Sequence, residues 1–350
     1  MQSPDVTIYG AGIFGLSTAW ACVKAGARVR VIDPNGPGAG ASGGVVGALA
    51  PHVPENWNDK KQFQLESLLM AEGFWRGVEE TSGISPGYAR LGRLQPIEDA
   101  RALELAHARA ESARALWKDA AAWEVIAMPE DGWAPPSATG FVIRDTLSAR
   151  LHPRRACAAL AGALGARGVE IAAEGEARGI VLHATGVAGL EALSQELGQP
   201  VGGAVKGQGA LLHFSAPDAP QLFADALHVI PHADGTTAVG STSERDYETA
   251  NGTDHLLEEV IERAMRVVPV LHGARVVARW AGLRPRARSR APMLGAHPTR
   301  EGEFIANGGF KIGFGMAPKV AQVMAALMLE GEDRIPPGFR PEASLAKGAA

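Results

Sequence analysis

The first 33 residues alternate between apolar runs and glycines in a way that predicts a strand, a helix and a second strand. Residues 6–9 form a short, mostly apolar run typical of a buried strand. Residues 13–25 are small and apolar, which favours a helix that ends before Gly26. The sequence RVRVID then predicts a strand ending on Asp33. Together these segments predict one βαβ unit.

Helical spacing of alanine, leucine and glutamate continues further along the chain. It predicts helices over residues 61–82 and 101–124. A further helix is expected after Pro153, and the sequence GIVLHATGVAG predicts a strand that runs into a glycine turn. Near the end, the turn-rich NGGFKIGFG opens a helix that Gly331 closes. These segments predict a parallel sheet covered by helices.

The pattern changes between residues 208 and 283. The sequences GALLHF, LHVIPH and TTAVGST predict short strands, with Asp234 and Gly235 as a hairpin turn between the last two. Apolar positions at helical spacing in DHLLEEVIERAMRVV predict a covering helix. The fold class is therefore α/β with an α+β second domain: a Rossmann-like domain with a mostly parallel sheet, and a second domain with an antiparallel sheet.

Composition narrows the class of protein. A chain of 350 residues is long enough for two domains with buried cores. The net charge of −4, with basic residues spread out, argues against nucleic acid as a partner. Cys22 and Cys157 lie far apart and outside any C-x-x-C or His/Cys cluster, which argues against disulfide, zinc and iron–sulfur frameworks and favours a cytoplasmic location. Glycines interrupt the apolar stretch at residues 6–23, so no membrane association is expected.

The sequence GAGIFG directly follows the first predicted strand and opens the first predicted helix. Gly10 permits the turn, Gly12 lets backbone amides approach a pyrophosphate, and Gly15 lets helix and strand pack closely. Asp33 lies near the roughly 20-residue spacing expected of a ribose acceptor. This unit predicts a dinucleotide without distinguishing NAD from FAD. The glycine-rich residues 36–47 favour FAD, because a nicotinamide enzyme usually continues with alternating helices and strands.

Six segments in order resemble the successive motifs of glycine oxidases, in the D-amino-acid oxidase family of flavoproteins, with sarcosine oxidases as cousins. They read GAGIFGLSTA, GASGGVVGALAP, VLHATG, PVGGAVKGQG, WAGLRPRARSRAPMLG and NGGFKIGFGMAP. The resemblance covers nearly the whole chain. It implies a discontinuous FAD-binding domain (residues 1–85, 143–207 and 284–342), a substrate-binding domain (residues 86–142 and 208–283) and a tail (residues 343–350).

The same motifs imply which residues contact FAD. Amides of a helix beginning between Gly313 and Met316 would face flavin N1 and C2=O, although this segment is also readable as a plain helix cap. No cysteine follows Cys157, so the cofactor is expected to bind non-covalently. A hairpin usual in relatives is missing between Gly168 and Gly186, which leaves the adenine contacts open. The implied contacts are Gly10, Gly12, Ile13, Phe14, Gly15, Asp33, Pro34, Ala41, Ser42, Gly47, Ala48, Leu49, Ala184, Thr185, Gly186, Gly309, Lys311, Ile312, Gly313 and Phe314.

Four residues are expected at the substrate. Arg284 in GLRP matches the arginine that binds the substrate carboxylate in the family, with a solvated basic run as the alternative. Lys311 stands where sarcosine oxidases also have a lysine. It is interpreted as a second anchor for the carboxylate, with an exposed turn residue as the alternative. His228 and Ser243 replace the Tyr and Met of glycine oxidases, which implies a changed substrate preference. His228 is also readable as an ordinary strand histidine.

The resemblance implies oxidation of a small amino acid or N-substituted glycine. Hydride transfer to flavin N5 would give an imine, with molecular oxygen as the expected acceptor and hydrogen peroxide as its product. The alternatives are a dehydrogenase that passes electrons to a quinone or carrier, and a flavin-binding protein without turnover. The expected partner is a small amine-bearing carboxylic acid, and assembly as a homo-oligomer is left open. No metal is expected.

Overall fold

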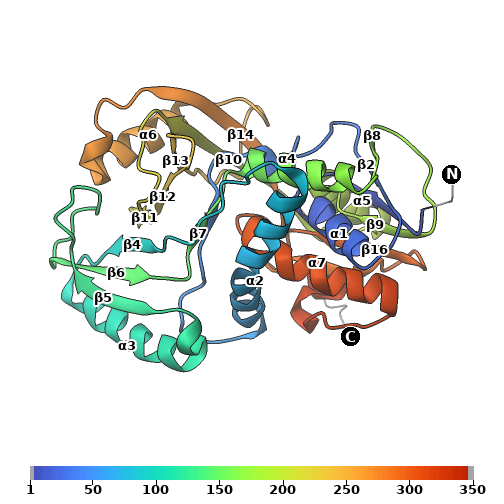
Figure 1. Ribbon diagram of the computed structural model, residues 1–350, viewed down its shortest axis with the longest axis horizontal. Helices are drawn as coiled ribbons and strands as arrows, with labels where there is room; N and C mark the ends of the chain where they lie inside the picture. Colours follow the sequence, from blue (N-terminus) through green and yellow to red (C-terminus); the bar gives the residue numbers. More distant parts are fainter. Residues whose placement is uncertain (1–3, 346–350) are drawn as a thin grey trace.

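A sheet of six strands forms the core of one of the two lobes of this computed structural model, which describes residues 4–345 (Figure 1). Neighbouring strands are parallel except for the first pair, which is antiparallel. In their order across the sheet, the strands are β15 (Met293–Ala296), β16 (Glu303–Asn307), β9 (Ile180–His183), β1 (Val6–Tyr9), β2 (Val29–Ile32) and β8 (Ile171–Ala172). The mostly parallel sheet predicted from the sequence is confirmed.

The predicted βαβ unit is present with nearly the predicted bounds. Helix α1 (Ile13–Lys24) follows β1, and both are almost wholly buried. Gly10 has a φ of +104°, and a Cβ there would lie 2.3 Å from the Ala184 carbonyl oxygen. A Cβ at Gly15 would lie 1.9 Å from the Gly10 carbonyl oxygen. These two glycines therefore allow strand, turn and helix to pack closely.

Helices cover this six-stranded sheet. Helix α1 packs against α4 and α7, and α2 packs against α4 and α7. Helix α5 lies instead against β10 and β14, two long strands that lead into the second lobe. Sequence reasoning had anticipated a glycine turn at the start of α5 but not the helix itself. The bounds are α2 (Asp59–Ser82), α4 (Pro153–Ala166), α5 (Gly186–Glu196) and α7 (Gly313–Glu330).

The second lobe is built on a sheet of eight strands. It is antiparallel as predicted, except that β4 and β11 pair in parallel. A separate two-stranded ladder joins β3 (Ala48–Leu49) to β7 (Ala149–Arg150). In order, the eight strands are β14 (Val276–Ala287), β10 (Gly202–Leu212), β13 (Thr237–Gly240), β12 (Leu227–Pro231), β11 (Gln221–Ala224), β4 (Arg93–Pro96), β6 (Phe141–Asp145) and β5 (Trp123–Ala127).

Two helices cover the second sheet. The predicted covering helix is α6 (His255–Val267), whose buried face contacts β10, β12 and β13. Helix α3 (Ala100–Trp117) packs against β5 and ends seven residues before the predicted end at residue 124. Lys118 has a φ of +51°, which turns the chain out of the helix, and Trp123 already belongs to β5. The prediction that the helix extends to residue 124 is therefore wrong.

Strands β10 and β14 run side by side and connect the two lobes (Figure 1). Their antiparallel register extends from Gly202 opposite Ala287 to Leu212 opposite Val276. Two of the boundaries expected between domains, 207/208 and 283/284, fall inside these strands, and a third, 142/143, falls inside β6. The exact division into domains stays a prediction, but both lobes share one continuous pair of strands.

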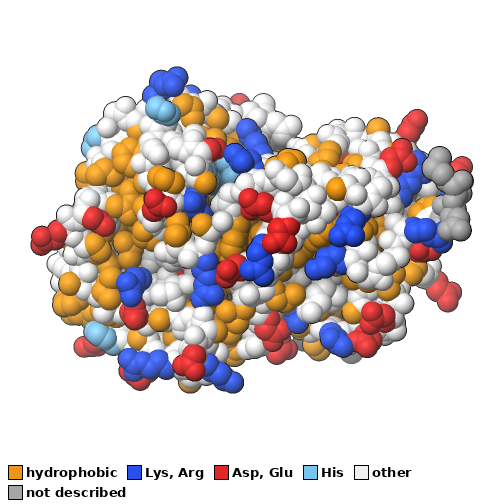
Figure 2. All heavy atoms as spheres, viewed as in Figure 1, with side chains coloured by type: hydrophobic (Ala, Val, Ile, Leu, Met, Phe, Trp, Pro, Cys, Tyr) orange, Lys and Arg blue, Asp and Glu red, His pale blue; other side chains and the backbone are white. Residues whose placement is uncertain are grey.

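Figure 2 shows acidic and basic side chains interspersed over one face of the molecule. Among residues 4–345, no helix has the length and apolar character needed to cross a membrane. The same residues contain no cluster of three or more His, Cys, Asp or Glu side chains arranged to hold a metal ion.

Candidate active site

A cavity of about 1120 Å³ lies where the two lobes meet. Its walls come from the glycine loop before α1, from the start of α7, and from β12 and β14 of the second lobe. Ligand pockets commonly measure roughly 300–1,000 Å³, so this cavity is large enough for an extended cofactor together with a small substrate. Several of its lining residues are glycines, including Gly12, Gly186, Gly309 and Gly313, which leaves backbone amides accessible.

Four helices, α1, α4, α5 and α7, begin at this cavity. Their own N-cap residues make no side-chain capping hydrogen bond, and none has an acidic residue in the first turn. Helices α2, α3 and α6 begin elsewhere, and each is capped by the side chain of its N-cap residue, Asn58, Asp99 and Asp254 respectively. A helix N-terminus attracts anions through its free amides and its dipole. The cavity therefore meets four helix ends that carry no negative charge of their own.

The glycine loop and residues 39–46 face one another across the phosphate end of the cavity. The Ser42 hydroxyl accepts a hydrogen bond from the Ile13 amide at 2.9 Å. A Cβ on Gly12 would lie only 3.3 Å from Ser42 Oγ. Asp33 accepts hydrogen bonds from the amides of Ala11 at 2.7 Å and Asn35 at 2.9 Å, which fixes its carboxylate at the end of β2. This arrangement fits a dinucleotide cofactor, because a cradle without side chains lies beside an oriented acid.

Most of the implied cofactor contacts line the cavity. Three do not. Gly15 packs against Gly10, as described above, and a Cβ on Gly47 would lie 1.7 Å from the Leu151 carbonyl oxygen. Leu49 is fully buried in the core. Gly15 and Gly47 thus permit close backbone packing beside the cavity. The residues that do line it are Gly10, Gly12, Ile13, Phe14, Asp33, Pro34, Ala41, Ser42, Ala48, Ala184, Thr185, Gly186, Gly309, Lys311, Ile312, Gly313 and Phe314.

Arg284 lies on β14 at the cavity wall and is only 8% exposed. Its Nη1 donates a hydrogen bond to the Thr242 carbonyl oxygen at 3.1 Å, and its Cζ lies 5.7 Å from the centroid of the Trp280 ring. No carboxylate forms an ion pair with it among residues 4–345. Burial lowers the pKa of Arg284 to about 10, against the opposing charge of Glu244, so the group remains charged at neutral pH. A buried cation without a carboxylate in direct contact is costly and predicts an anionic ligand.

Lys311 lines the same cavity from the turn before α7. Lys311 is an exposed residue. Partial desolvation of its ammonium lowers its pKa, and the positive charges of Arg284 and Arg286 lower the pKa further. Lys311 Nζ lies 5.8 Å from the centroid of the Phe310 ring. The fold thus brings Arg284 of β14 and Lys311 of the turn before α7 to one cavity. Neither has an acidic partner within the described part of the chain.

His228 also lines the cavity, whereas Ser243 does not. The ring of His228 lies 4.8 Å from the ring of Phe223, and its Nδ1 is buried without a hydrogen-bond partner among the described residues. Burial, followed by the charges of Arg93 and Lys311, lowers the pKa of His228 to about 3. The imidazole is therefore neutral at physiological pH and is suited to hydrogen bonding rather than to general base catalysis. Ser241, two residues before Ser243, lines the cavity instead.

Sequence reasoning missed several wall residues. Trp280 and Arg284 lie on one face of β14, because side chains four apart in a strand point the same way. That alternation was visible in the sequence WAGLRP and could have identified Trp280. Phe223 and Asn251 carried no comparable signal, because they reach the cavity only through the pairing of β11 and through the segment after β13.

The segment after β13 is held by a buried polar cluster. Lys206 is 1% exposed and pairs with Asp254 at 3.0 Å and with Glu244 at 3.5 Å. Gln208 donates to Glu244 at 3.0 Å and to Asp254 at 2.8 Å. The Thr242 carbonyl accepts a hydrogen bond from Arg284, and the Thr242 hydroxyl donates one to Glu244. This cluster fixes the carbonyl that orients the Arg284 guanidinium.

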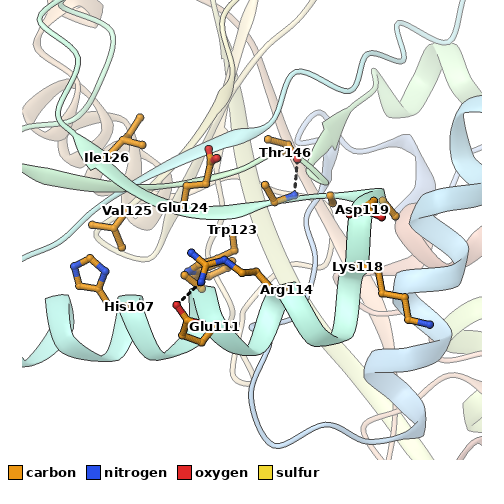
Figure 3. A pocket seen from close by; sticks show the side chains of 14 residues that line it. His107, Glu111, Arg114, Lys118, Asp119, Trp123, Glu124, Val125, Ile126 and Thr146 are labelled. Atoms are coloured by element: carbon orange, nitrogen blue, oxygen red, sulfur yellow. Dashed lines mark hydrogen bonds and ion pairs between the residues drawn. The ribbon is translucent and has the colours of Figure 1, made fainter.

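A second hollow of about 730 Å³ lies on the far side of the second lobe, between α3 and β5 (Figure 3). Figure 3 shows Glu111 and Arg114 paired on α3, with Glu124 on the facing strand. None of the residues that the sequence predicted at the cofactor or substrate lines this hollow. The chemistry implied by the sequence is therefore concentrated in the larger cavity.

Comparison with known proteins gives a match over nearly the whole chain. Residues 5–327 match the model of a family described as FAD dependent oxidoreductase. A glycine oxidase of Pseudomonas aeruginosa is 28% identical over 371 residues, which cover 96% of this chain and 98% of that protein. A glycine oxidase of Pseudomonas putida is 35% identical over 143 residues, 40% of this chain and 39% of that protein.

Solved structures share the fold at low identity. The crystal structure of glycine oxidase from Geobacillus kaustophilus has a TM-score of 0.83 at 20% identity and covers 97% of this chain and 98% of that one. Iminodiacetate oxidase from Chelativorans sp. BNC1 has a TM-score of 0.80 at 20% identity, with 96% and 98% covered. L-amino acid deaminase from Proteus myxofaciens, in complex with anthranilate, has a TM-score of 0.82 at 18% identity, with 99% and 94% covered.

Proposed function

The chain belongs to the family of FAD dependent oxidoreductases, and we propose that it oxidises a small amino acid or N-substituted glycine to the corresponding imine. It is an enzyme of the amino-acid or amine oxidoreductase class with FAD as cofactor. The observation that carries the choice of substrate is Arg284, a buried guanidinium without an acidic partner among residues 4–345, at the wall of the cofactor cavity. A guanidinium in that position matches the geometry of a carboxylate.

The cofactor would occupy the length of the cavity. Backbone around Gly12 and the start of α1 would hold its diphosphate, and Asp33 would meet a ribose. The amides of α7, which begins at Gly313, and the ammonium of Lys311 would supply positive potential at the flavin end. When bound, FAD supplies an acceptor for the hydride of the amine-bearing carbon.

The protein's own residues bind and orient the substrate. Arg284 and Lys311 bind the carboxylate, and the Thr242 carbonyl holds the Arg284 guanidinium in place. The neutral His228 can accept a hydrogen bond from the amine, whose lone pair must be free of a proton for oxidation. Loss of a hydride from carbon and of a proton from nitrogen leaves the imine. Water then adds to the imine and releases ammonia or an amine from the oxo acid.

Anaerobic titration tests this function. The purified holoprotein is mixed with glycine, sarcosine, D-alanine, larger D-amino acids, their L-enantiomers and iminodiacetate, and the visible flavin absorbance is followed. We expect at least one of these acids to bleach the absorbance, and we expect the methyl ester of that acid to react far more slowly, because it lacks the carboxylate. If every amine leaves the absorbance unchanged, the protein is a flavin-binding protein without this turnover.

The electron acceptor is a separate part of the proposal. Molecular oxygen would take two electrons and two protons and leave as hydrogen peroxide. One observation favours an alternative: strand β13 (Thr237–Gly240) carries no lysine, whereas the matching strand of sarcosine oxidases carries the lysine that promotes the oxygen reaction. A dehydrogenase using a quinone or carrier would be re-oxidised slowly in air and rapidly by an artificial quinone. Equal yields of peroxide and oxo acid in air would support the oxidase.

A further inference from the structure

Five cationic residues at one side of the cavity have no acidic partner within the described part of the chain. Elsewhere, arginines such as Arg93, Arg109 and Arg144 are paired with carboxylates. The chain as a whole has a net charge of −4, so this excess of positive charge is local. The five residues, called here the cationic rim, are Lys60, Arg284, Arg286, Arg290 and Lys311.

Contacts link the cationic rim to the cavity, which two of its five residues, Arg284 and Lys311, line directly. The Phe310 ring forms part of the cavity wall, and Arg286 Cζ lies 5.2 Å from its centroid. Lys311 Nζ approaches the same ring, and the Phe310 amide donates to the Pro285 carbonyl oxygen at 3.0 Å. Phe310 has a φ of +45°, a conformation that non-glycine residues rarely adopt and that concentrates at functional sites. The Phe310 ring thus contacts both Lys311, which lines the cavity, and Arg286, which does not.

Lys60 extends the cationic rim from a third element. It stands in the first turn of α2 (Asp59–Ser82), where the helix dipole disfavours a positive charge. Its Nζ donates to the Arg290 carbonyl oxygen at 2.5 Å, which holds it beside the end of β14. Burial lowers the pKa of Lys60, and Arg286 and Arg290 lower it further. A lysine held against other cations in this way indicates a site for a negatively charged group.

One carboxylate does not account for all of these charges. Arg284 and Lys311 line the cavity and suffice for a single carboxylate, whereas Arg286, which contacts the Phe310 ring, and Lys60, held near the end of β14, do not line it. The acidic residue that lines the cavity is Asp33, and its oxygens already accept two backbone amides at the opposite, ribose end. These two outer cations, Arg286 and Lys60, are therefore left without a counterion among residues 4–345.

We propose that the substrate carries a second anionic group and that Arg286 and Lys60 bind it. The substrate class is then an amine-bearing dicarboxylic acid, with the second carboxylate either on the side chain or on an N-substituent. This inference rests on the proposed oxidation of an amino acid in the same cavity. Arg284 and Lys311 hold the carboxylate next to the reacting carbon. The outer cations, Arg286 and Lys60, favour substrates that carry a second carboxylate.

Matched acid and amide pairs test the selection. The anaerobic flavin reduction is measured with aspartate and asparagine, with glutamate and glutamine, in both enantiomers, and with N-(carboxymethyl)glycine and its mono-amide. Each pair has nearly the same shape and differs by one charge. We expect the dicarboxylic member of at least one pair to have a kcat/KM about tenfold higher or more. Equal values within every pair that reacts would overturn the proposal.

Variants assign the selection to the outer cations. In R286Q and K60Q, the acid-to-amide ratio of kcat/KM should fall toward one, through a higher KM for the acid and with the amide unchanged. K118Q, which removes one positive charge on the second lobe away from the cavity, should keep the wild-type ratio. A loss of bound FAD in R286Q would overturn the proposal, because it would assign the cationic rim to the cofactor. An equal loss for acid and amide would also overturn it.

Binding provides a readout that does not depend on turnover. Malonate and acetate are titrated into the holoprotein, and the shift of the visible flavin spectrum gives their dissociation constants. Malonate should bind about tenfold or more tightly in the wild type, and R286Q should lose that difference. This measurement separates two failures. If no amine reduces the flavin, the proposed oxidation is wrong, but a malonate preference that R286Q abolishes would still support a site for two carboxylates.

Discussion

Gly207 and Arg284 lie on neighbouring strands so close together that a Cβ on Gly207 would be 1.7 Å from Nη1 of Arg284. The guanidinium of Arg284 therefore occupies the space that a side chain at Gly207 would fill. The Thr242 carbonyl holds the guanidinium from another side through its hydrogen bond. The orientation of the proposed carboxylate anchor thus depends on a glycine that never contacts the substrate.

The variant G207A tests this dependence. The added methyl group has to displace the guanidinium, so we expect the KM of a carboxylate substrate to rise about tenfold or more with little change in bound FAD. G203A is the matched control, because a Cβ at that position of the same strand has no heavy atom within 4 Å. An unchanged KM in G207A would show that Arg284 does not bind the carboxylate in this orientation.

Removal of the Arg284 charge should have a larger effect. R284M leaves a side chain of similar length without a donor, and we expect kcat/KM to fall by about 100-fold or more, because the loss of one partner of a buried ion pair typically costs roughly 2–5 kcal/mol. R284K keeps the charge but not the planar pair of donors, so its loss should be smaller. Both variants should retain the flavin spectrum. Wild-type kcat/KM in R284M would contradict the proposed site.

Lys311 should impose an alkaline limit on substrate binding. Burial and the neighbouring arginines lower its pKa below the ordinary value of 10.5, so it loses its charge at a lower pH than a free lysine. We expect the KM for a carboxylate substrate to rise with pH as that charge is lost. K311M should have a high KM at every pH without this limb, and K311R should keep a low KM to higher pH. If the KM of K311M rises with pH as in the wild type, the rise is caused by a group other than Lys311.

Two positions of the glycine loop should respond differently to substitution. In G10A, the Cβ would lie 2.3 Å from the Ala184 carbonyl oxygen at a φ of +104°, so we expect loss of stability and of FAD together. In G12A, the Cβ would meet only Ser42 Oγ at 3.3 Å, so the apoprotein should stay close to its wild-type Tm while FAD binds more weakly. G77A, on an open face of α2, should retain FAD and be as stable as wild type or slightly more so.

His232 should make the fold sensitive to acid. Its ring is 1% exposed, lies 4.7 Å from the ring of His152 and hydrogen-bonds the Val45 carbonyl oxygen at 3.0 Å. Burial, with the charges of His152 and Arg150, lowers its pKa to about 4, while the Val45 hydrogen bond and Asp234 oppose that shift. The neutral ring is therefore favoured in the folded state. Stability is complete above the unfolded pKa of about 6.5 and declines as the pH falls toward 4.

The decline attributable to His232 is about 3 kcal/mol at most. It is measured as the free energy of unfolding in urea at pH 7 and at pH 4.5. H232N can still donate a hydrogen bond to the Val45 carbonyl but carries no titrating group, so it should lose less stability between the two pH values. Parallel declines in the wild type and H232N would assign the acid sensitivity to other groups.

The part of the fold that the sequence predicts well is the part that glycines constrain locally. Gly10, Gly15 and Gly331 are positions where a side chain would clash or where φ is positive, so the bounds of β1, α1 and the end of α7 follow from them. The end of α3 did not follow. The run from Trp117 to Trp123 remains rich in alanine after the helix stops, and composition does not show the turn at Lys118.

Pairings between distant segments were not visible in the local pattern. The parallel contact of β4 with β11 joins Arg93 to Gln221, and no periodicity in either segment indicates it. The same reason explains which residues of the site could be predicted and which could not. Arg284 and Lys311 could be identified from motifs, whereas Ser243, expected at the substrate because it replaces the Met of glycine oxidases, does not line the cavity. Phe223 reaches the wall only because of the sheet order.

The long ladder of β10 and β14, regular from Gly202 to Leu211, has a consequence for motion during turnover. Eleven paired positions, from Gly202 and Ala287 to Leu212 and Val276, run through both lobes. Rotation of one lobe against the other would have to break main-chain hydrogen bonds at the centre of the molecule, so a hinge of the kind that closes many two-lobed enzymes is unfavourable here. We therefore expect substrate and product to pass beside the segment from Ser241 to Asp254, which lines the cavity at Ser241, Ala250 and Asn251 and which Lys206 and Gln208 anchor at Glu244 and Asp254.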